Sequence, residues 1–587
     1  MFLDYLTHDE RFEEARRALR RGSALYAPSF YAPYVLAGVV RESDASGWLV
    51  VVPEAEQAAR LAAELSVYLE REVATLPARG VLYGADVAPA AHILGERQRA
   101  LAALEEGGVV VADAVALLER FIPLALQPRP LTLSVGEEVV FDDLLAHLAT
   151  LGYERAEQVR ERGEFAVRGG IVDVFPSSAE PVRAEFWGDT VESLRRFSVF
   201  SQRAVGAVES CLIGTAAEVD PTDADFQTAV QQELAGWEVS GRDEAPDEAY
   251  RRAETRALAR LSQRFVDLAG LAGERALRLA AIGPDDIVRS LAGFDAELQT
   301  TLPADVRERF YLPLLEARRL LSDALAIDLT QRDQRWQFHA SRPQAAGRDI
   351  TAAERDLRRL ADDGYRVFVV FRHPGEASRA GYRLKSLQVT MLDAAELFED
   401  GSRPEAAGAD GAGAMRPEPG IAADAPGSPA AAAAGSGAIR PADGLLPPGV
   451  YFVAAPLREG FVSGELKLAV MGERSLVRAA PSGPRFVGGA RLTSFFDLRP
   501  GDYVVHEDHG IANFSGIETR TVAGVTRDYL FLRFAGEDKL FVPHDQIGKV
   551  TRYIGASGAA PALNHLGGAA WLTVKTRARK AVVEMAG

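Results

Sequence analysis

Cysteine is almost missing from this sequence of 587 residues, in which Cys211 stands alone. A single cysteine forms neither an intrachain disulfide nor a thiolate metal site, so we expect a protein of the reducing cytoplasm. The sequence also lacks an apolar run of roughly 18 residues, which excludes a membrane-spanning helix and a membrane partner. The first ten residues are acidic and have no apolar signal core, which argues against secretion.

Catalytic motifs are missing as well. The phosphate-binding loop G-x-x-x-x-G-K-[ST] occurs nowhere, and residues 29–47, where an α/β motor would carry it, contain no Gly-Lys-Thr. Ser177 and Ser178 have no evident partner for nucleophilic catalysis. We assign His506 and His509 to turn and core roles, because no further metal ligands lie near them. We therefore expect no catalytic residue, no metal and no bound cofactor in this chain.

Positive charge is in the minority, with 66 Lys and Arg against 83 Asp and Glu and a net charge of −17. Proteins that bind DNA with their whole surface are usually basic, so any DNA contact should be a local patch or lie outside this chain. The acidity is also explained by solubility alone. The length exceeds what one hydrophobic core supports, which predicts several domains.

The first segment, residues 1–130, alternates short apolar strands with helical patterns. Strands are predicted at 48–53 and 108–112, and helices at 54–68 and 114–121. Buried strands that alternate with helices are typical of a parallel α/β sheet. We interpret this segment as a degenerate α/β domain of the helicase type, without its phosphate loop.

The second segment, residues 131–215, has a different pattern. Strand-like runs at 165–167, 171–175, 182–187 and 191–199 are separated by glycine-containing turns. This arrangement predicts an antiparallel sheet in a small α+β domain.

The middle of the chain predicts a return to α/β structure. Residues 216–330 are mostly helical, including a pattern from Glu248 to Leu279, and we interpret them as a continuation of the first domain. Residues 331–480 predict a second small α/β domain, which begins near Gln337. Within it, a block at 401–448 rich in Ala, Gly, Pro and Ser predicts a disordered insertion that splits the domain.

The last part of the chain predicts a small β-barrel over residues 494–556, followed by a helical tail at 557–587. Its strands are predicted at 502–506, 511–519, 528–534 and 539–543. The tail stops within its helical pattern, so we expect the chain to be the front part of a longer protein.

One string in the second segment is long enough to identify a family. Residues 162–176, 181–189 and 192–197 resemble the domain shared by the excision-repair protein UvrB and bacterial transcription-repair coupling factors. In that family this domain binds the damage-recognition ATPase UvrA. The resemblance implies a UvrA-binding site with the residues Arg168, Arg183, Phe186 and Trp187.

Strand periodicity adds to this site. Side chains alternate between faces, which puts Arg183, Glu185 and Trp187 on one face and Phe186 on the other. The first set should be exposed, and Phe186 should lie with the aliphatic core. Two alternatives remain open: Trp187 half-buried at a hairpin, and Arg183 paired with Glu185.

UvrB itself is a poorer match than the coupling factors. UvrB carries an ATP-binding loop and a long aromatic hairpin that inserts into DNA. The corresponding residues 83–99 are short and contain one aromatic residue, Tyr83, which leaves no room for that hairpin. The UvrB scaffold without its DNA-working parts resembles the front end of a coupling factor.

The predicted barrel carries a second resemblance. Residues 498–506, 508–511, 516–518, 527–530 and 538–543 resemble the CarD-like domain that interacts with RNA polymerase. In the family this domain grips the polymerase β subunit by edge-strand pairing. The resemblance implies contacts from the residues Ile517, Thr519, Arg520 and Thr521.

Position 520 departs from the family pattern, which often has an apolar residue there. Strand alternation puts Ile517, Thr519 and Thr521 on one face and Arg520 on the other. Arg520 is thus a candidate because of its position, although its side chain is charged where the family often has an apolar one.

The tail from Leu566 to Lys580 resembles the linker helix that leads into the family's translocase motor. Its basic residues predict DNA phosphate contacts, unless they form a solvated helix face. These candidates are Lys575, Arg577, Arg579 and Lys580. By resemblance, ATP, Mg²⁺ and most contacts with double-stranded DNA belong to a motor beyond this chain.

The leading hypothesis is therefore a monomeric adaptor that binds the RNA polymerase β subunit and UvrA in transcription-coupled repair. Its longer parent would be an ATP-dependent DNA translocase that releases stalled polymerase. One alternative is a CarD-like transcription regulator, favoured by the C-terminal hundred residues alone. Another is a UvrB-like repair helicase, against which the missing phosphate loop argues.

Overall fold

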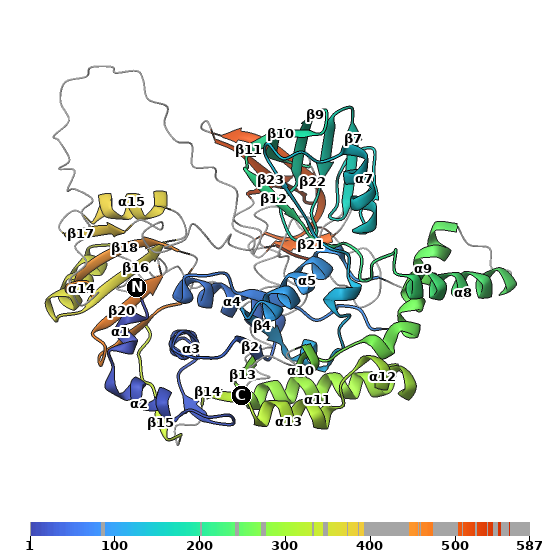
Figure 1. Ribbon diagram of the computed structural model, residues 1–587. Coiled ribbons are helices and arrows are strands. Elements are labelled where there is room, and N and C mark those ends of the chain that lie inside the picture. The colour runs from blue at the N-terminus through green and yellow to red at the C-terminus, as the bar shows by residue number, and fades with distance from the viewer. Residues whose placement is uncertain are drawn as a thin grey trace, which may run out of the picture.

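The computed structural model gives positions for most of the chain (Figure 1). The described residues are 2–83, 88–199, 202–240, 246–271, 277–330, 334–343, 350–371, 374–384, 387–392, 445–455, 457, 459–472, 503–506, 509–522, 525–536, 538–543, 550–552 and 563. Within these ranges, no helix has both the length and the apolar character needed to cross a membrane.

The α/β body is built on a seven-stranded sheet of order β15-β1-β14-β13-β2-β4-β3, in which every neighbouring pair is parallel. The strands are β1 (Ala24–Tyr26), β2 (Gly47–Val52), β3 (Ala74–Leu76), β4 (Val109–Asp113), β13 (Leu277–Ile282), β14 (Leu325–Asp328) and β15 (Trp336–Gln337). All residues of β2 are buried, as expected for a parallel strand covered on both faces.

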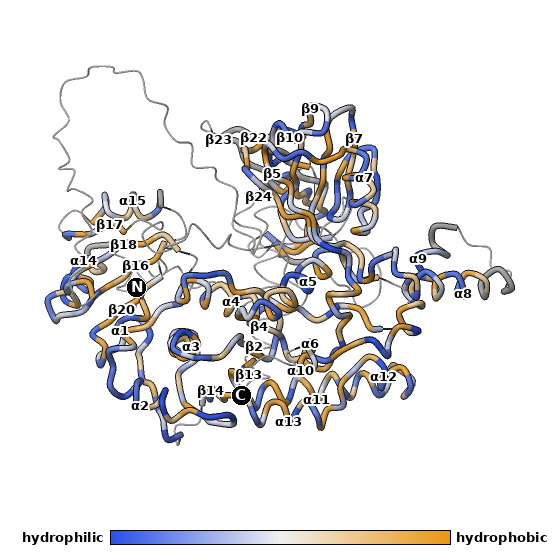
Figure 2. Tube along the Cα trace, in the orientation of Figure 1, coloured by the Kyte–Doolittle hydropathy of each residue, from blue (hydrophilic) through white to orange (hydrophobic). Residues whose placement is uncertain are grey.

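Helices cover both faces of this sheet. The side chains of Val50 and Val52 pack with α3 (Ala32–Arg41) and α4 (Ala55–Leu69). Leu49 and Val51 point the opposite way, toward the second set of helices. That set comprises α5 (Ala91–Glu105), α6 (Ala114–Leu118), α11 (Pro284–Thr301) and α13 (Leu314–Ser322). In Figure 2, α11 and α13 alternate between hydrophobic and hydrophilic residues, as helices on a core do.

Two expectations for the middle of the chain are wrong in detail. The helical pattern predicted out to Leu279 is wrong at its end, because β13 begins at Leu277, after α9 (Pro246–Leu261) and the short α10 (Leu268–Leu271). β15 pairs with β1 and therefore belongs to the body, not to the second α/β domain. The physical reason is long-range pairing: β13 lies between β2 and β14, and this burial decides its conformation.

An antiparallel-rich domain is inserted into this body. It has a six-stranded sheet of order β11-β10-β9-β8-β7-β6, and α7 (Phe141–Thr150) packs on one face. The strands are β6 (Glu154–Arg155), β7 (Glu164–Arg168), β8 (Ile171–Val174), β9 (Val182–Trp187), β10 (Thr190–Phe197) and β11 (Ala204–Ala207). A short antiparallel ribbon, β5 (Leu131–Ser134) with β12 (Ser210–Ile213), packs into the same core. We call residues 131–218 the inserted domain.

A helical pair follows the inserted domain. α8 (Ala224–Ser240) packs along α9, and the two project from the body at the right of Figure 1. α12 (Ala304–Phe310) lies between α11 and α13 along the chain.

The second α/β domain has a five-stranded sheet of order β17-β18-β16-β20-β19. Its elements are α14 (Ile350–Asp362), β16 (Arg366–Phe371), α15 (Pro374–Arg383), β17 (Val389–Leu392), β18 (Gly449–Ala454), β19 (Phe461–Ser463) and β20 (Leu468–Gly472). Strands from both sides of the insertion pair in this sheet, because β18 lies between β16 and β17.

The predicted disordered block ends earlier than expected. Leu446 N–H donates to the Tyr5 hydroxyl at 3.1 Å, and its carbonyl accepts from Arg366 Nε at 2.8 Å. These bonds fix residues 445–448, so the prediction of disorder is wrong for them. The rest of the block, 401–444, lies outside the described residues.

The last domain is a five-stranded antiparallel sheet of order β24-β23-β22-β21-β25. Its strands are β21 (Tyr503–His506), β22 (Gly510–Val522), β23 (Val525–Arg533), β24 (Lys539–Pro543) and β25 (Val550–Arg552). A bulge separates Phe514 from Gly516, whose φ of 135° suits glycine. The helical tail predicted at 557–587, apart from residue 563, and its four basic DNA candidates lie outside the described residues.

Candidate functional sites: two docking surfaces

Strand β9 presents its two faces to different surroundings. Val182, Ala184 and Phe186 are buried against α7, whereas Trp187 is 81% exposed. The ring of Phe186 packs edge-on against Phe141, with centroids 5.3 Å apart. Phe186 therefore belongs to the core beneath the exposed face. The alternative of a half-buried Trp187 is wrong.

The hairpin that carries Trp187 is anchored to α7. Gly188 takes a positive φ of 62° at the turn, a conformation that favours glycine. The next residue, Asp189, accepts hydrogen bonds from Phe141 N–H at 3.1 Å and, through its carbonyl, from Val139 N–H at 2.7 Å. These two bonds fix the backbone of the turn that follows Trp187.

Arg183 is engaged within the domain. Its Nε and Nη2 donate to the two carboxylate oxygens of Asp173 at 2.6 and 2.8 Å. This bidentate bond raises the pKa of Arg183, and its guanidinium also lies over the ring of Phe197. The alternative pairing with Glu185 is wrong, since Glu185 accepts from Ser193 Oγ at 2.9 Å. The expectation of an exposed Arg183 is also wrong, because only 19% of its side chain is exposed.

Strand pairing adds further residues to the face of the sheet that carries Trp187. Arg168 pairs with Ile171, and Ile171 pairs in turn with Glu185, so their side chains share one face across three strands. Arg195 of β10 is exposed on the same face and lies 3.8 Å from Glu185. We define the open face as Arg168, Ile171, Glu185, Trp187 and Arg195. Ile171 and Arg195 were missed by sequence reasoning, because only strand pairing places them on the same face of the sheet as Trp187.

The second candidate surface is an edge of the C-terminal sheet. β21 covers β22 only from Gly510 to Asn513, whereas β23 pairs with β22 as far as Val522. In the part of the chain that the structure describes, β22 beyond Phe514 thus has one edge without a strand partner. The polymerase candidates from Ile517 to Thr521 lie on this edge, and their side chains are outside the described residues.

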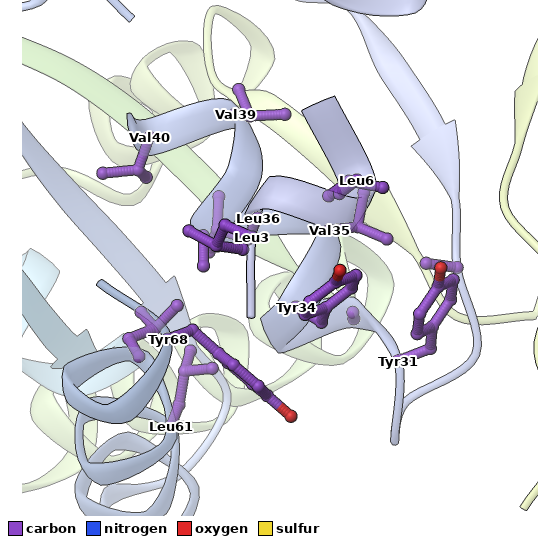
Figure 3. Close-up of a cluster of buried hydrophobic side chains, with 14 of the residues drawn as sticks. Leu3, Leu6, Tyr31, Tyr34, Val35, Leu36, Val39, Val40, Leu61 and Tyr68 are labelled. Carbon is purple, nitrogen blue, oxygen red and sulfur yellow. The ribbon is translucent and has the colours of Figure 1, made fainter. Parts of the chain in front are cut away.

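Aromatic rings fill the region where an α/β nucleotide site would hold phosphate, between β1 and α3. Tyr31 stacks on Tyr34 at 5.6 Å, and Phe461 lies 4.6 and 4.7 Å from the two rings. Burial raises the pKa of both tyrosines. The close-up in Figure 3 shows the two rings at the start of α3, with Tyr68 of α4 nearby.

The histidine pair of the C-terminal sheet packs ring against ring. The centroids of His506 and His509 are 4.7 Å apart, and His506 is buried. Among the described residues there is no group of three or more potential metal ligands.

Comparisons with known proteins identify the two domains that carry these surfaces. The UvrB interaction domain matches residues 131–218, and the CarD-like/TRCF RID domain matches residues 498–554. The transcription-repair-coupling factor of Mycobacterium tuberculosis is 30% identical over 92% of this chain and 45% of its own length. That of Bacillus subtilis is 27% identical over 82% of this chain and 40% of its own length. The chain thus spans about half the length of the curated relatives it matches. It belongs to the family of transcription-repair coupling factors, as the part that carries these two domains.

Proposed function

We propose that this chain is the adaptor part of a coupling factor, which binds UvrA through the open face and the RNA polymerase β subunit through the free edge of β22. The observation that carries the UvrA assignment is Trp187, an 81% exposed tryptophan on a sheet that matches the UvrB interaction domain. An exposed aromatic anchor held by a rigid turn is typical of interface hot spots.

The chemistry around Trp187 suits a protein partner. Arg168 and Arg195 supply exposed cations at opposite sides, and Ile171 adds apolar surface. Arginine and tryptophan are enriched in interface cores, whereas lysine, which this face lacks among its five residues, is depleted there. Arg183 and Phe186 act from within the domain, where they fix β9 against β8 and α7.

The polymerase assignment rests on the free edge of β22. An unpaired strand edge offers a row of N–H and C=O groups to an extended partner segment, so β-augmentation is the expected mode. We further propose that the C-terminal sheet closes into a small barrel.

The remaining activities of coupling factors are assigned to the rest of the full-length protein. These are ATP and Mg²⁺ binding, DNA translocation and polymerase release. The aromatic rings between β1 and α3 support this division, since they occupy the place of a phosphate loop. The basic residues Lys575, Arg577, Arg579 and Lys580 are proposed as a minor DNA contact.

The test is a pair of binding titrations with the purified chain, one against UvrA and one against the polymerase β subunit. Both should bind, and addition of ATP should change neither affinity. Binding of the β subunit without UvrA would favour a CarD-like regulator instead, and ATP turnover by the chain would favour a UvrB-like enzyme.

A further inference from the structure

The inserted domain is joined to the body by two chain segments, which enter near Pro128 and leave near Thr215. One buried side chain of the body, Gln98 of α5, bonds to both segments. Its Nε2 donates to the Pro128 carbonyl at 2.7 Å, and its Oε1 accepts from Thr215 N–H at 3.0 Å. A primary amide is suited to this double role because it offers a donor and an acceptor side by side.

A buried ion pair lies on the exit segment. Arg79 of the body has no exposed side-chain surface, and its Nε and Nη2 donate to Glu218 at 2.8 and 2.6 Å. Burial alone would lower the pKa of Arg79, but Glu218 outweighs it and the pKa is raised. The guanidinium also lies 4.4 Å from the ring centroid of Tyr83. Arg79 therefore keeps its charge at every physiological pH.

The ion pair is part of a larger buried network. The backbone N–H of Arg79 donates to Glu119, and Glu119 pairs with Arg97 at 2.5 Å. Gly95 lies on α5 about one turn before Gln98. It packs against Ser177 of the inserted domain so closely that a Cβ at position 95 would overlap the Ser177 Oγ. Polar groups buried this completely stabilise one arrangement strongly, because any movement leaves a charge or donor unpaired.

We propose that Arg79, Gln98, Thr215 and Glu218 form a lock that holds the inserted domain, and with it the open face, in one orientation relative to the body. These are positioning residues: none lies on the open face. The lock itself depends only on the contacts above, whereas its value for UvrA docking rests on the proposed function. A coupling factor needs such a lock if UvrA is to be delivered in a defined direction.

A second ion pair between the same two units provides the matched control. Arg251 of α9 lies 3.8 Å from Glu154 of β6, and both side chains are largely exposed. Exposed pairs of this length contribute little, because water screens them and the side chains lose entropy. Removing this pair should leave the orientation unchanged.

The experiment measures the orientation by electron–electron double resonance between two spin labels. Labels at Asp143→Cys on α7 and Arg60→Cys on α4, in a Cys211→Ala background, report on the inserted domain and the body. The parent and the Glu154→Gln control should give one narrow distance distribution. Glu218→Gln and Gln98→Ala should give a broadened distribution or a second distance. A narrow distribution in both lock variants would overturn the proposal.

UvrA titration of the same variants separates a positioning role from a purely structural one. Because the open face is intact, Glu218→Gln should bind UvrA within about threefold of the parent. Loss of UvrA binding together with loss of circular dichroism would show that Glu218 supports the fold. The distance distribution of Gln98→Ala would then decide whether the lock fixes the orientation of the inserted domain. If the parent itself fails to bind UvrA while the lock variants broaden, the proposed function is wrong and the lock stands.

Discussion

Replacing Trp187 by alanine should weaken UvrA binding and leave the fold intact. Trp187 is 81% exposed, so its removal should change the stability of the inserted domain by no more than about 0.5 kcal/mol. A large aromatic residue buries up to about 250 Å², of which the exposed part here is about 200 Å². At about 25 cal/mol per Å² this sets an upper limit near 5 kcal/mol. Hot-spot residues typically contribute about 2–4 kcal/mol, or a loss of about 30- to 1000-fold in affinity.

The measurement is a titration of UvrA against the immobilised chain. Tyr382→Ala is the control, because Tyr382 is 78% exposed on α15 of the second α/β domain and should not affect UvrA. Circular dichroism verifies that both variants are folded. The reasoning is refuted if folded Trp187→Ala binds UvrA within about threefold of the parent, or if the control loses as much affinity.

Three further changes test other parts of the structure. Burial raises the pKa of Glu254 to about 7, so its charging destabilises the fold as pH rises from about 4.5 to 7. Glu254→Gln should therefore stabilise the protein at pH 8 by about 1–2 kcal/mol and not at pH 4, measured by denaturant unfolding. Arg183→Ala strips a buried carboxylate of its partner and should destabilise the inserted domain by about 2–3 kcal/mol, whereas exposed Arg168→Ala should be neutral in the same measurement. Arg520→Glu reverses one charge on the free edge of β22, so affinity for the polymerase β subunit should fall about tenfold in a titration; unchanged affinity would remove Arg520 from the site.

Strand alternation was sufficient to separate the two faces of β9. Phe186 and Trp187 are neighbours in sequence, yet one is in the core and the other is exposed, because one face of an antiparallel sheet is buried and the period of two reports it. Strand alternation could not identify the partner of Arg183. Asp173 lies on the adjacent strand, and finding it requires the register between β8 and β9, which depends on the whole sheet.

The α/β body shows that long-range pairing can also decide whether a whole segment forms a strand. The runs of valine in β2 and β4 predict buried strands on their own. The segment Leu277–Ile282 contains arginine and alanine and is compatible with a helix, so only its place between β2 and β14 makes it a strand. The lock residue Gln98 was equally hidden, since nothing in a helical pattern shows that two distant segments bond to one amide.

The central claim is that one chain holds UvrA and the polymerase at separate surfaces, and a bridging measurement tests it most directly. The polymerase β subunit is immobilised, the chain is added to saturation, and UvrA is then applied. UvrA should be retained only when the chain is present, and Trp187→Ala should abolish this second step while the chain itself stays bound. Displacement of the chain by UvrA, or UvrA retention that is unaffected by Trp187→Ala, would contradict the claim.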